Sequence, residues 1–217
     1  MKVAITVQSI QHPNYSEQGH YLNVKWQQFA EKVGIILVPV SSIALLNTLI
    51  SKNYIEGVIL SGGGNLSKNF PNKNLTMKLN EKVDLDREEI ESKLIDFSIN
   101  SNIPLIGVCR GMQALSLYHG SKLLGVEGHV NSRHILEYYC PILKRKIKRN
   151  INSYHDYAIK DEFVPEAFLP NASHDGSVEQ MMHENLKILG IMWHPEREDE
   201  FSLLDIELFK KFFGIIR

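Results

Sequence analysis

Cysteine, long apolar stretches and an excess of either charge are all scarce in this sequence. Two cysteines among 217 residues argue against a disulfide framework. The start, "MKVAITVQSIQHPNY", turns polar too soon for an export signal, so we expect a cytoplasmic protein. No apolar run approaches the ~20 residues that a membrane span requires. The net charge of −1 gives no reason to expect a nucleic-acid partner or an anionic membrane.

Internal repeats, low-complexity segments and long linkers are absent as well. A chain of 217 residues is long enough for one sizeable hydrophobic core. Its 43% apolar and 23% charged residues are typical of a soluble globular protein. We therefore expect a single domain over residues 1–217.

Short runs rich in valine and isoleucine alternate with helical patterns along the chain. Continuous apolar runs predict strands that are buried on both faces, as in a parallel sheet. The predicted strands are 2–7, 34–40, 57–62, 103–108 and 187–193, and the predicted helices are 21–34, 43–53, 86–101, 112–120 and 200–214. This alternation predicts an α/β fold, with an open, mostly parallel sheet covered by helices on both faces.

Two segments depart from this pattern. Residues 123–160 contain short strand-like pieces and turns, which predict a small antiparallel extension at one edge of the sheet. Residues 64–83 are rich in asparagine and lysine and predict an exposed loop after a strand end.

The segment "IPLIGVCRGMQAL" places Cys109 between glycines 107 and 111 at the junction of a strand and a helix. This G-x-C-x-G spacing has the form of the nucleophile elbow, with sulfur in place of oxygen. A helix start lowers the pKa of a thiol through its dipole and its free N–H groups. A buried, inert thiol at the end of a core strand fits this stretch alone equally well.

The segment "GIMWHPER" ends the last predicted strand. His194 and Glu196 are two residues apart, so on a strand both side chains leave from the same face, while Pro195 points away. A carboxylate beside a histidine holds the imidazole tautomer and stabilises its charged form, as in a nucleophile–base–orienter triad. The alternative is a strand exit with a solvated acid.

The segment "SGGGN", residues 61–65, ends the third predicted strand. It matches neither glycine-rich phosphate-binding motif, and its best use is an oxyanion hole formed with the N–H of Arg110. Gln113 lies four residues after Cys109, hence on the same helical face. An ordinary surface glutamine is the alternative at that position.

Together, "SGGGN", "GVCRGMQAL", "NSYHDYAI" and "GIMWHPER" resemble the class I glutamine amidotransferase-like superfamily, with its flavodoxin-like fold. Within it they are most similar to the γ-glutamyl-γ-aminobutyrate hydrolase-like branch, which "LDREE" also fits. The motifs span about residues 57–200. The resemblance implies roles for eight residues: a catalytic triad of Cys109, His194 and Glu196, oxyanion donors Gly63 and Arg110, and substrate-binding Gln113, Ser153 and Tyr154. We add His155, in the same motif, as a residue of the substrate pocket.

The resemblance implies hydrolysis of a γ-glutamyl amide through a thioester on Cys109, with no cofactor. A glutaminase subunit that delivers ammonia to a synthase partner is an alternative with the same chemistry, as is a γ-glutamyl-γ-aminobutyrate hydrolase. An inactive scaffold is disfavoured by the intact triad. The polar insertion at 65–80 supplies Lys68, Lys73 and Lys78 near the leaving group. We therefore predict a small-molecule γ-glutamyl substrate that carries phosphate or a nucleotide.

The remaining reactive or charged residues receive structural interpretations. His129 and His134 do not predict a metal site, because the sequence shows no cysteine or carboxylate placed to complete a tetrahedral set. His155 is interpreted as structural or pocket-lining rather than catalytic, and Cys140 as a bystander in a loop. The run "KRKIKR", 144–149, is interpreted as a solvated face, with contact to substrate phosphates as the lesser alternative.

Overall fold

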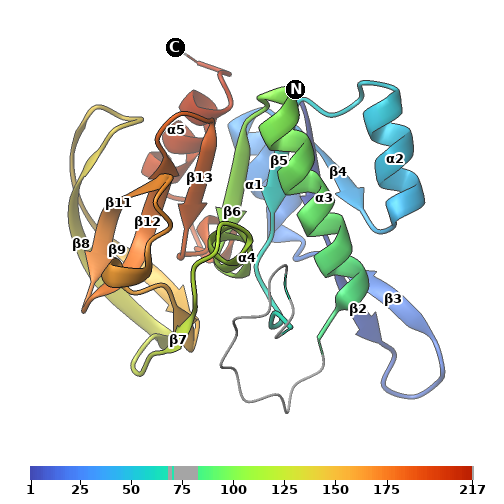
Figure 1. Cartoon of the computed structure of the whole chain (residues 1–217), viewed down its shortest axis with the longest axis horizontal. Coiled ribbons are helices and arrows are strands. Elements are labelled where there is room, and N and C mark those ends of the chain that lie inside the picture. The colour runs from blue at the N-terminus through green and yellow to red at the C-terminus, as the bar shows by residue number, and fades with distance from the viewer. Residues whose placement is uncertain (68–69, 71–82, 217) are drawn as a thin grey trace.

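The computed structural model describes residues 1–67, 70 and 83–216. A central sheet runs in the order β11-β12-β13-β6-β5-β1-β4 (Figure 1). Its parallel strands are β1 (Lys2–Thr6), β4 (Ile36–Val40), β5 (Gly57–Leu60), β6 (Leu105–Val108) and β13 (Ile188–Ile191). Strands β11 (Phe168–His174) and β12 (Ser177–His183) run antiparallel at one edge. The predicted α/β fold with an open, mostly parallel sheet is confirmed.

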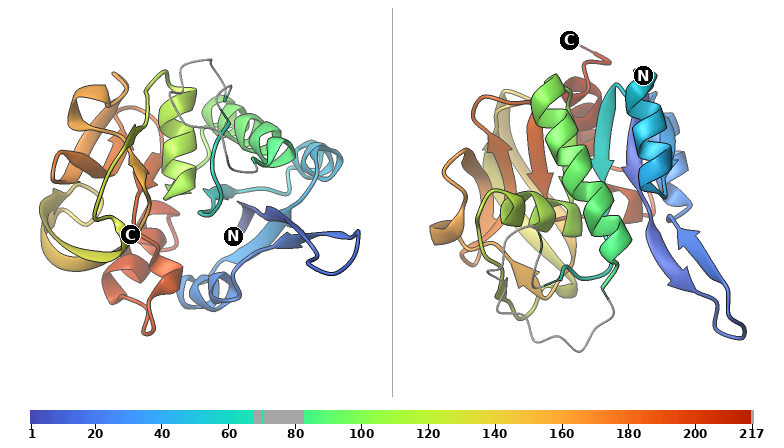
Figure 2. Two further views of the ribbon diagram at one scale, coloured as in Figure 1. Left: turned by 90° about the horizontal axis from the view of Figure 1, so that it is seen from below. Right: turned by 45° about the vertical axis from the view of Figure 1, so that its right-hand side comes forward.

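Helices cover both faces of this sheet (Figure 2). Helices α1 (Lys25–Val33) and α5 (Leu203–Phe212) pack on one face, where the rings of Phe29 and Phe209 meet edge to face at 5.0 Å. Helices α2 (Ile43–Ser51), α3 (Leu85–Ser101) and α4 (Arg110–Tyr118) pack on the other. All five lie where the sequence predicts a helix, although α1 begins at Lys25 instead of residue 21.

The predicted small antiparallel extension is confirmed, although it forms a sheet of its own beside β11 instead of continuing the main sheet. Strands β8 (Val130–Cys140) and β9 (Arg145–Tyr154) form a separate two-stranded sheet whose apolar side chains join the core beside α5. The edge of the main sheet is occupied by β11 and β12, which the sequence pattern did not predict. A further short pair joins β7 (Leu124–Gly125) to β10 (Tyr157–Ala158).

Two more local features differ from the prediction. Residues 8–21 form a hairpin of β2 (Gln8–Gln11) and β3 (Gln18–Tyr21). The segment is mostly polar, so it has no apolar run from which a strand could be predicted. Within the expected loop at 64–83, Leu66 and Phe70 are buried in the core beneath α3 and are not exposed. Short 3₁₀ turns occupy Asp161–Phe163 and Pro195–Arg197.

The parallel strands place three chemically distinctive segments at one edge of the sheet. Strands β5, β6 and β13 are neighbours that run in the same direction, so their carboxyl ends lie together. Residues 61–65, Cys109 and His194 each follow one of these ends. In open α/β sheets this is the edge where ligands bind. No helix in the described part of the chain is long and apolar enough to cross a membrane.

Candidate active site

Cys109 occupies the turn between β6 and α4. Its backbone has φ 50° and ψ −107°, a strained conformation for a residue with a side chain. The flanking glycines are required for close packing: a Cβ on Gly111 would lie 2.1 Å from the carbonyl oxygen of Leu60, and one on Gly107 would lie 2.6 Å from the backbone of Gly111. The strained backbone of Cys109 favours the nucleophile elbow over an inert core thiol. Strained residues persist only where the surrounding packing holds them, and they cluster at functional sites.

His194 and Glu196 are joined directly. Nδ1 of His194 lies 2.7 Å from Oε1 of Glu196, and both side chains are buried. The predicted pairing is therefore observed, but the predicted backbone is wrong. Strand β13 ends at Ile191, and Pro195 begins a 3₁₀ turn that brings the two side chains together. Proline suits this first position because the N–H that it lacks would have no partner in the turn.

The surroundings of His194 favour its charged form. Burial by itself lowers the pKa of the imidazole, but the charge of Glu196, the charge of Cys109 and hydrogen bonds to both raise that pKa to about 9. Cys109 and His194 line the same cavity. The site can thus hold an imidazolium beside a thiolate, which is the pairing that a cysteine nucleophile requires.

The glycine loop after β5 is fastened by Arg87, which sequence reasoning missed. The Arg87 guanidinium donates hydrogen bonds to the carbonyl oxygens of Gly63 at 2.8 Å and Gly62 at 3.2 Å, and to that of Ser61. Gly63 has φ 89° and Gly64 has φ 74°, a region that only glycine adopts readily. The carbonyl oxygens of the glycine loop face Arg87. The backbone N–H groups of the same loop can therefore donate to a ligand on the other side.

Arg87 belongs to a buried network of charges beneath the site. Its Nε donates to Glu91 at 2.8 Å, and Glu91 also accepts from the guanidinium of Arg110. Burial and the charge of Arg110 lower the pKa of Arg87 to about 10, although Glu91 opposes the shift. The side chain of Arg110 is held by Glu91 and by the carbonyl oxygen of Asn65, and its backbone N–H is the group predicted for the oxyanion role. The i, i+4 spacing of Arg87 and Glu91 is the sequence signal for this pair.

A cavity of about 120 Å³ contains most of the predicted site residues. It is lined by Gly63, Gly64, Asn65, Cys109, Arg110, Gln113, Tyr154, His155, Asp156, Tyr157, His194 and Arg197. Nε2 of Gln113 donates to the carbonyl oxygen of Tyr157 at 2.8 Å, so the amide supports the wall of the cavity. The ring of Tyr154 meets His194 edge to face at 5.7 Å.

Ser153 is the predicted substrate-binding residue that does not line this cavity. It is fully buried, and its hydroxyl donates to the carbonyl oxygen of His129 at 2.6 Å. Asn152, the residue before it, was missed by sequence reasoning. Its side chain binds the backbone of His194, which makes Asn152 part of the site.

A second cavity, of about 320 Å³, adjoins the first at the glycine loop, with Gly63, Gly64, Asn65 and Arg110 lining both. Its other walls come from the β2–β3 hairpin and from the start of α3. Among the described residues these walls carry polar groups and the acids Asp84 and Asp86. The lysines predicted to face the leaving group, Lys68, Lys73 and Lys78, lie outside the described residues.

Three other predictions from the sequence are decided by contacts. The prediction that no carboxylate is placed beside His129 is wrong, because Oε1 of Glu179 lies 3.4 Å from Nδ1 of His129. Cys140 ends strand β8 in the core and does not line the site cavity, so it is no loop residue. In the basic run, the partly buried Arg149 makes two hydrogen bonds of 2.6 Å to Asp205, so its guanidinium is already paired with a carboxylate.

Comparisons with known proteins place the chain in a family and identify its fold. The sequence model described as peptidase C26 matches residues 3–196. The chain is 30% identical over 220 residues to γ-glutamyl-CDP-amidate hydrolase from Campylobacter jejuni subsp. jejuni serotype O:2, covering 100% of both chains. It is 24% identical over 167 residues to a glutamine-hydrolyzing GMP synthase subunit from Methanocaldococcus jannaschii, covering 76% and 77% of the two chains. The structure of a glutamine amidotransferase from Thermotoga maritima matches with a TM-score of 0.60 at 16% identity, covering 90% of this chain and 76% of that one, and so shares the fold.

Proposed function

The chain belongs to the peptidase C26 family of class I glutamine amidotransferase-like proteins, and we propose that it hydrolyses a γ-glutamyl amide bond through a thioester on Cys109. The observation that carries this proposal is the combination of a strained nucleophile elbow at Cys109 with the 2.7 Å pair of His194 and Glu196. An inert buried thiol would need neither the strained backbone of Cys109 nor a histidine that is paired with a carboxylate beside it.

The proposed reaction begins from the ion pair of the Cys109 thiolate and the His194 imidazolium, in which the thiol proton already lies on His194. The thiolate sulfur attacks the γ-carbonyl carbon. The carbonyl oxygen becomes negatively charged and accepts hydrogen bonds from the backbone N–H groups of Gly63 and Arg110. When this tetrahedral intermediate collapses, the C–N bond breaks and the imidazolium of His194 gives its proton to the leaving nitrogen. Glu196 keeps the imidazole oriented and stabilises its charge throughout.

The second half of the reaction repeats these steps with water. Neutral His194 removes a proton from a water molecule, and the resulting hydroxide attacks the thioester carbon. The C–S bond then breaks, glutamate leaves, and the thiolate and imidazolium pair is restored. We assign the glutamyl half of the substrate to the smaller cavity, beside Gln113, Tyr154 and His155.

For the leaving group, we propose the cytidine diphosphate amidate of γ-glutamyl-CDP-amidate. Two observations support this choice. The hydrolase of that name from Campylobacter jejuni is similar to this chain over its full length. The cavity of about 320 Å³ adjoins the nucleophile at the glycine loop and is larger than a γ-aminobutyrate group requires. We further propose that the reaction serves the synthesis of a capsular phosphoramidate.

A glutaminase that supplies ammonia to a synthase is the second candidate. The similarity to the GMP synthase subunit from Methanocaldococcus jannaschii favours it, because that protein is named as one part of a glutamine-hydrolysing enzyme. Its chemistry at Cys109 would be the same. The two candidates differ in substrate and in the need for a partner protein.

A comparison of substrates tests the proposal. The purified chain alone is assayed for glutamate release from γ-glutamyl-CDP-amidate, γ-glutamyl-γ-aminobutyrate and glutamine, with C109A as the blank. We expect the highest kcat/KM for the nucleotide conjugate. Its KM should rise with salt more than that of glutamine, because contacts between its phosphates and the lysines predicted at 65–80 would be screened. If glutamine is preferred, or is cleaved only with a synthase present, the ammonia-donating function replaces ours. If every substrate gives the rate of C109A, the chain is not a hydrolase of this class.

A further inference from the structure

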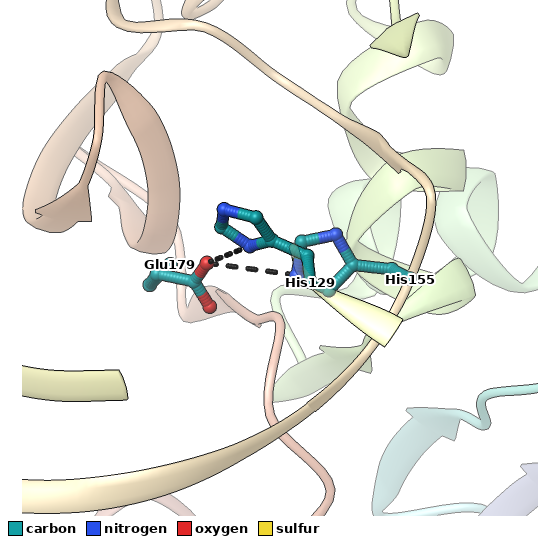
Figure 3. A group of neighbouring side chains, drawn as sticks. All are labelled: His129, His155 and Glu179. Carbon is teal, nitrogen blue, oxygen red and sulfur yellow. Dashed lines mark ion pairs between the residues drawn. The ribbon is translucent and has the colours of Figure 1, made fainter. Parts of the chain in front are cut away.

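A cluster of histidines around one glutamate lies apart from the nucleophile, between the β8–β9 hairpin and the edge of the main sheet. His129 precedes β8, His134 lies in β8, His155 follows β9, and His174 and Glu179 come from β11 and β12. The ring centroid of His129 is 4.3 Å from that of His134 and 4.8 Å from that of His155, and His174 stacks on His134 at 4.2 Å. Figure 3 shows His129 and His155 turned toward the carboxylate of Glu179.

The distances between the polar atoms match the edges of a small coordination polyhedron. Oε1 of Glu179 lies 3.4 Å from Nδ1 of His129 and 3.5 Å from Nε2 of His155. Nδ1 of His129 lies 3.1 Å from Nε2 of His134. A tetrahedral zinc ion with bonds of about 2.0–2.1 Å would separate its ligand atoms by about 3.3–3.4 Å. The ligand atoms of His129, His155 and Glu179 all lie within 4.8 Å of one another.

Glu179 is the part of the cluster that most needs a cation. Its side chain is fully buried, and within the described residues neither carboxylate oxygen has a hydrogen bond of normal geometry. Nε2 of His155 is buried and unpaired in the same sense. A buried carboxylate without hydrogen bonds is costly unless a positive charge compensates it, and a metal ion supplies that charge.

His155 is also held as metal-binding histidines are held. Its Nδ1 lies 3.2 Å from the carbonyl oxygen of Tyr157, to which it donates, so the lone pair of Nε2 faces Glu179. A backbone carbonyl on the other ring nitrogen fixes the tautomer and raises the basicity of a ligating imidazole. The same carbonyl accepts from Gln113 in the wall of the catalytic cavity.

We propose that His129, His155 and Glu179 bind a divalent transition-metal ion, with zinc as the favoured ion. Two imidazoles and one carboxylate are ligands that zinc accepts, and hard-cation sites for calcium or magnesium would need more oxygen atoms. These three residues fill three positions of a tetrahedral ion, and a water molecule would fill the fourth. The ion joins the β8–β9 hairpin to β12 and supports residues 155–157 beside the catalytic cavity.

Metal titration of the full-length protein tests this site without any assay of activity. The protein is treated with EDTA, dialysed, and titrated with Co²⁺ and Zn²⁺. We expect one equivalent of zinc by elemental analysis, the visible absorption of tetrahedral Co²⁺ that zinc displaces, and a higher Tm with zinc than without. If wild-type protein binds no zinc, lacks the tetrahedral absorption and keeps the same Tm, the proposal is overturned. The histidines would then pair with Glu179 by carrying protons, without a metal ion.

Two variants with matched chemistry locate the ion. E179Q keeps the shape of the side chain but removes its charge, and should weaken zinc binding by about tenfold or more. H183Q is the control, because His183 is also in β12 and mostly buried but contacts Phe168 and His119 instead of the cluster. We expect H183Q to bind zinc as wild type does. Equal zinc affinity in E179Q and wild type would overturn the proposal.

Discussion

Asn152 and His194 are joined by two hydrogen bonds that run in opposite directions. The Asn152 amide donates to the carbonyl oxygen of His194 at 2.8 Å, and its Oδ1 accepts from the His194 N–H at 2.8 Å. Both residues are buried. The end of strand β9 thus fixes the backbone of the proposed base, which lies beyond the end of its own strand and has no ladder partner to hold it.

This relationship predicts the behaviour of N152A. The substitution leaves the buried N–H of His194 unpaired, at a cost of about 1–3 kcal/mol in the free energy of unfolding. Because it lets the imidazole move, kcat should fall further than substrate binding weakens. Steady-state kinetics and denaturant unfolding measure both effects. N150A, at an exposed position of the same strand, is the control, and equal kcat values in the two variants would contradict the positioning role.

Replacing the proposed nucleophile should abolish turnover without unfolding the protein. We expect C109A to lower kcat by about 10⁴-fold or more, because no other described group in the cavity can form the thioester. Mass spectrometry of wild-type protein trapped with substrate should find a glutamyl adduct on Cys109. C140A should retain activity, since Cys140 is a core residue of β8. An adduct on Cys140 would refute the assignment.

The raised pKa of His194 predicts an alkaline limit to activity. Its imidazolium is present below about pH 9 and is lost above it, so kcat/KM should fall as the pH rises through about 9. In E196Q the charge that raises this pKa is gone, and the limit should move to lower pH. E200Q, which removes an exposed acid nearby, should leave it in place. An unchanged limit in E196Q would mean that another group sets it.

A methyl group at Gly62 should displace His194. A Cβ on Gly62 would lie 2.4 Å from Cε1 of His194, closer than two non-bonded carbon atoms can approach. We expect G62A to lower kcat/KM by about 100-fold, the scale of a misplacement near 1 Å. G19A is the control, because its Cβ would lie 3.8 Å from the nearest atom, in the β2–β3 hairpin. Wild-type kinetics in G62A would show that His194 has room to move.

The buried charges beneath the glycine loop predict a large loss of stability. E91Q removes the carboxylate that Arg87 and Arg110 share, and should lower the free energy of unfolding by about 3–5 kcal/mol. Glu89 of the same helix pairs with Lys93 at the surface, so E89Q should cost less than about 1 kcal/mol. Denaturant unfolding of the two variants makes the comparison. Similar losses in both would mean that the network contributes no more than a surface pair.

The sequence predicted the elements that obey simple periodicity and missed those that do not. The five parallel strands carry apolar runs and were all found. Strand β12 was missed because it buries Glu179, Gln180 and His183, residue types that are usually exposed. The hairpin at residues 8–21 was missed because its residues are mostly polar.

The candidate site divides in the same way. Cys109, His194 and Glu196 are recognisable from local spacing, although the backbone that joins the last two is a 3₁₀ turn and not the expected strand. The histidine cluster around Glu179 is drawn from four separate segments. No local spacing could predict it, because only the packing of the β8–β9 hairpin against β11 and β12 brings these residues together.

The place of β13 in the sheet has a consequence for how the protein is made. It comes after every other strand of the main sheet in the sequence, yet it lies between β6 and β12. While residues 110–187 are being translated, the Leu105–Val108 edge of β6 is apolar and has no partner on that side. An edge of this kind is open to pairing with other chains. A nascent or truncated chain that stops before residue 188 therefore lacks the proposed base, His194, and leaves this apolar edge of β6 uncovered.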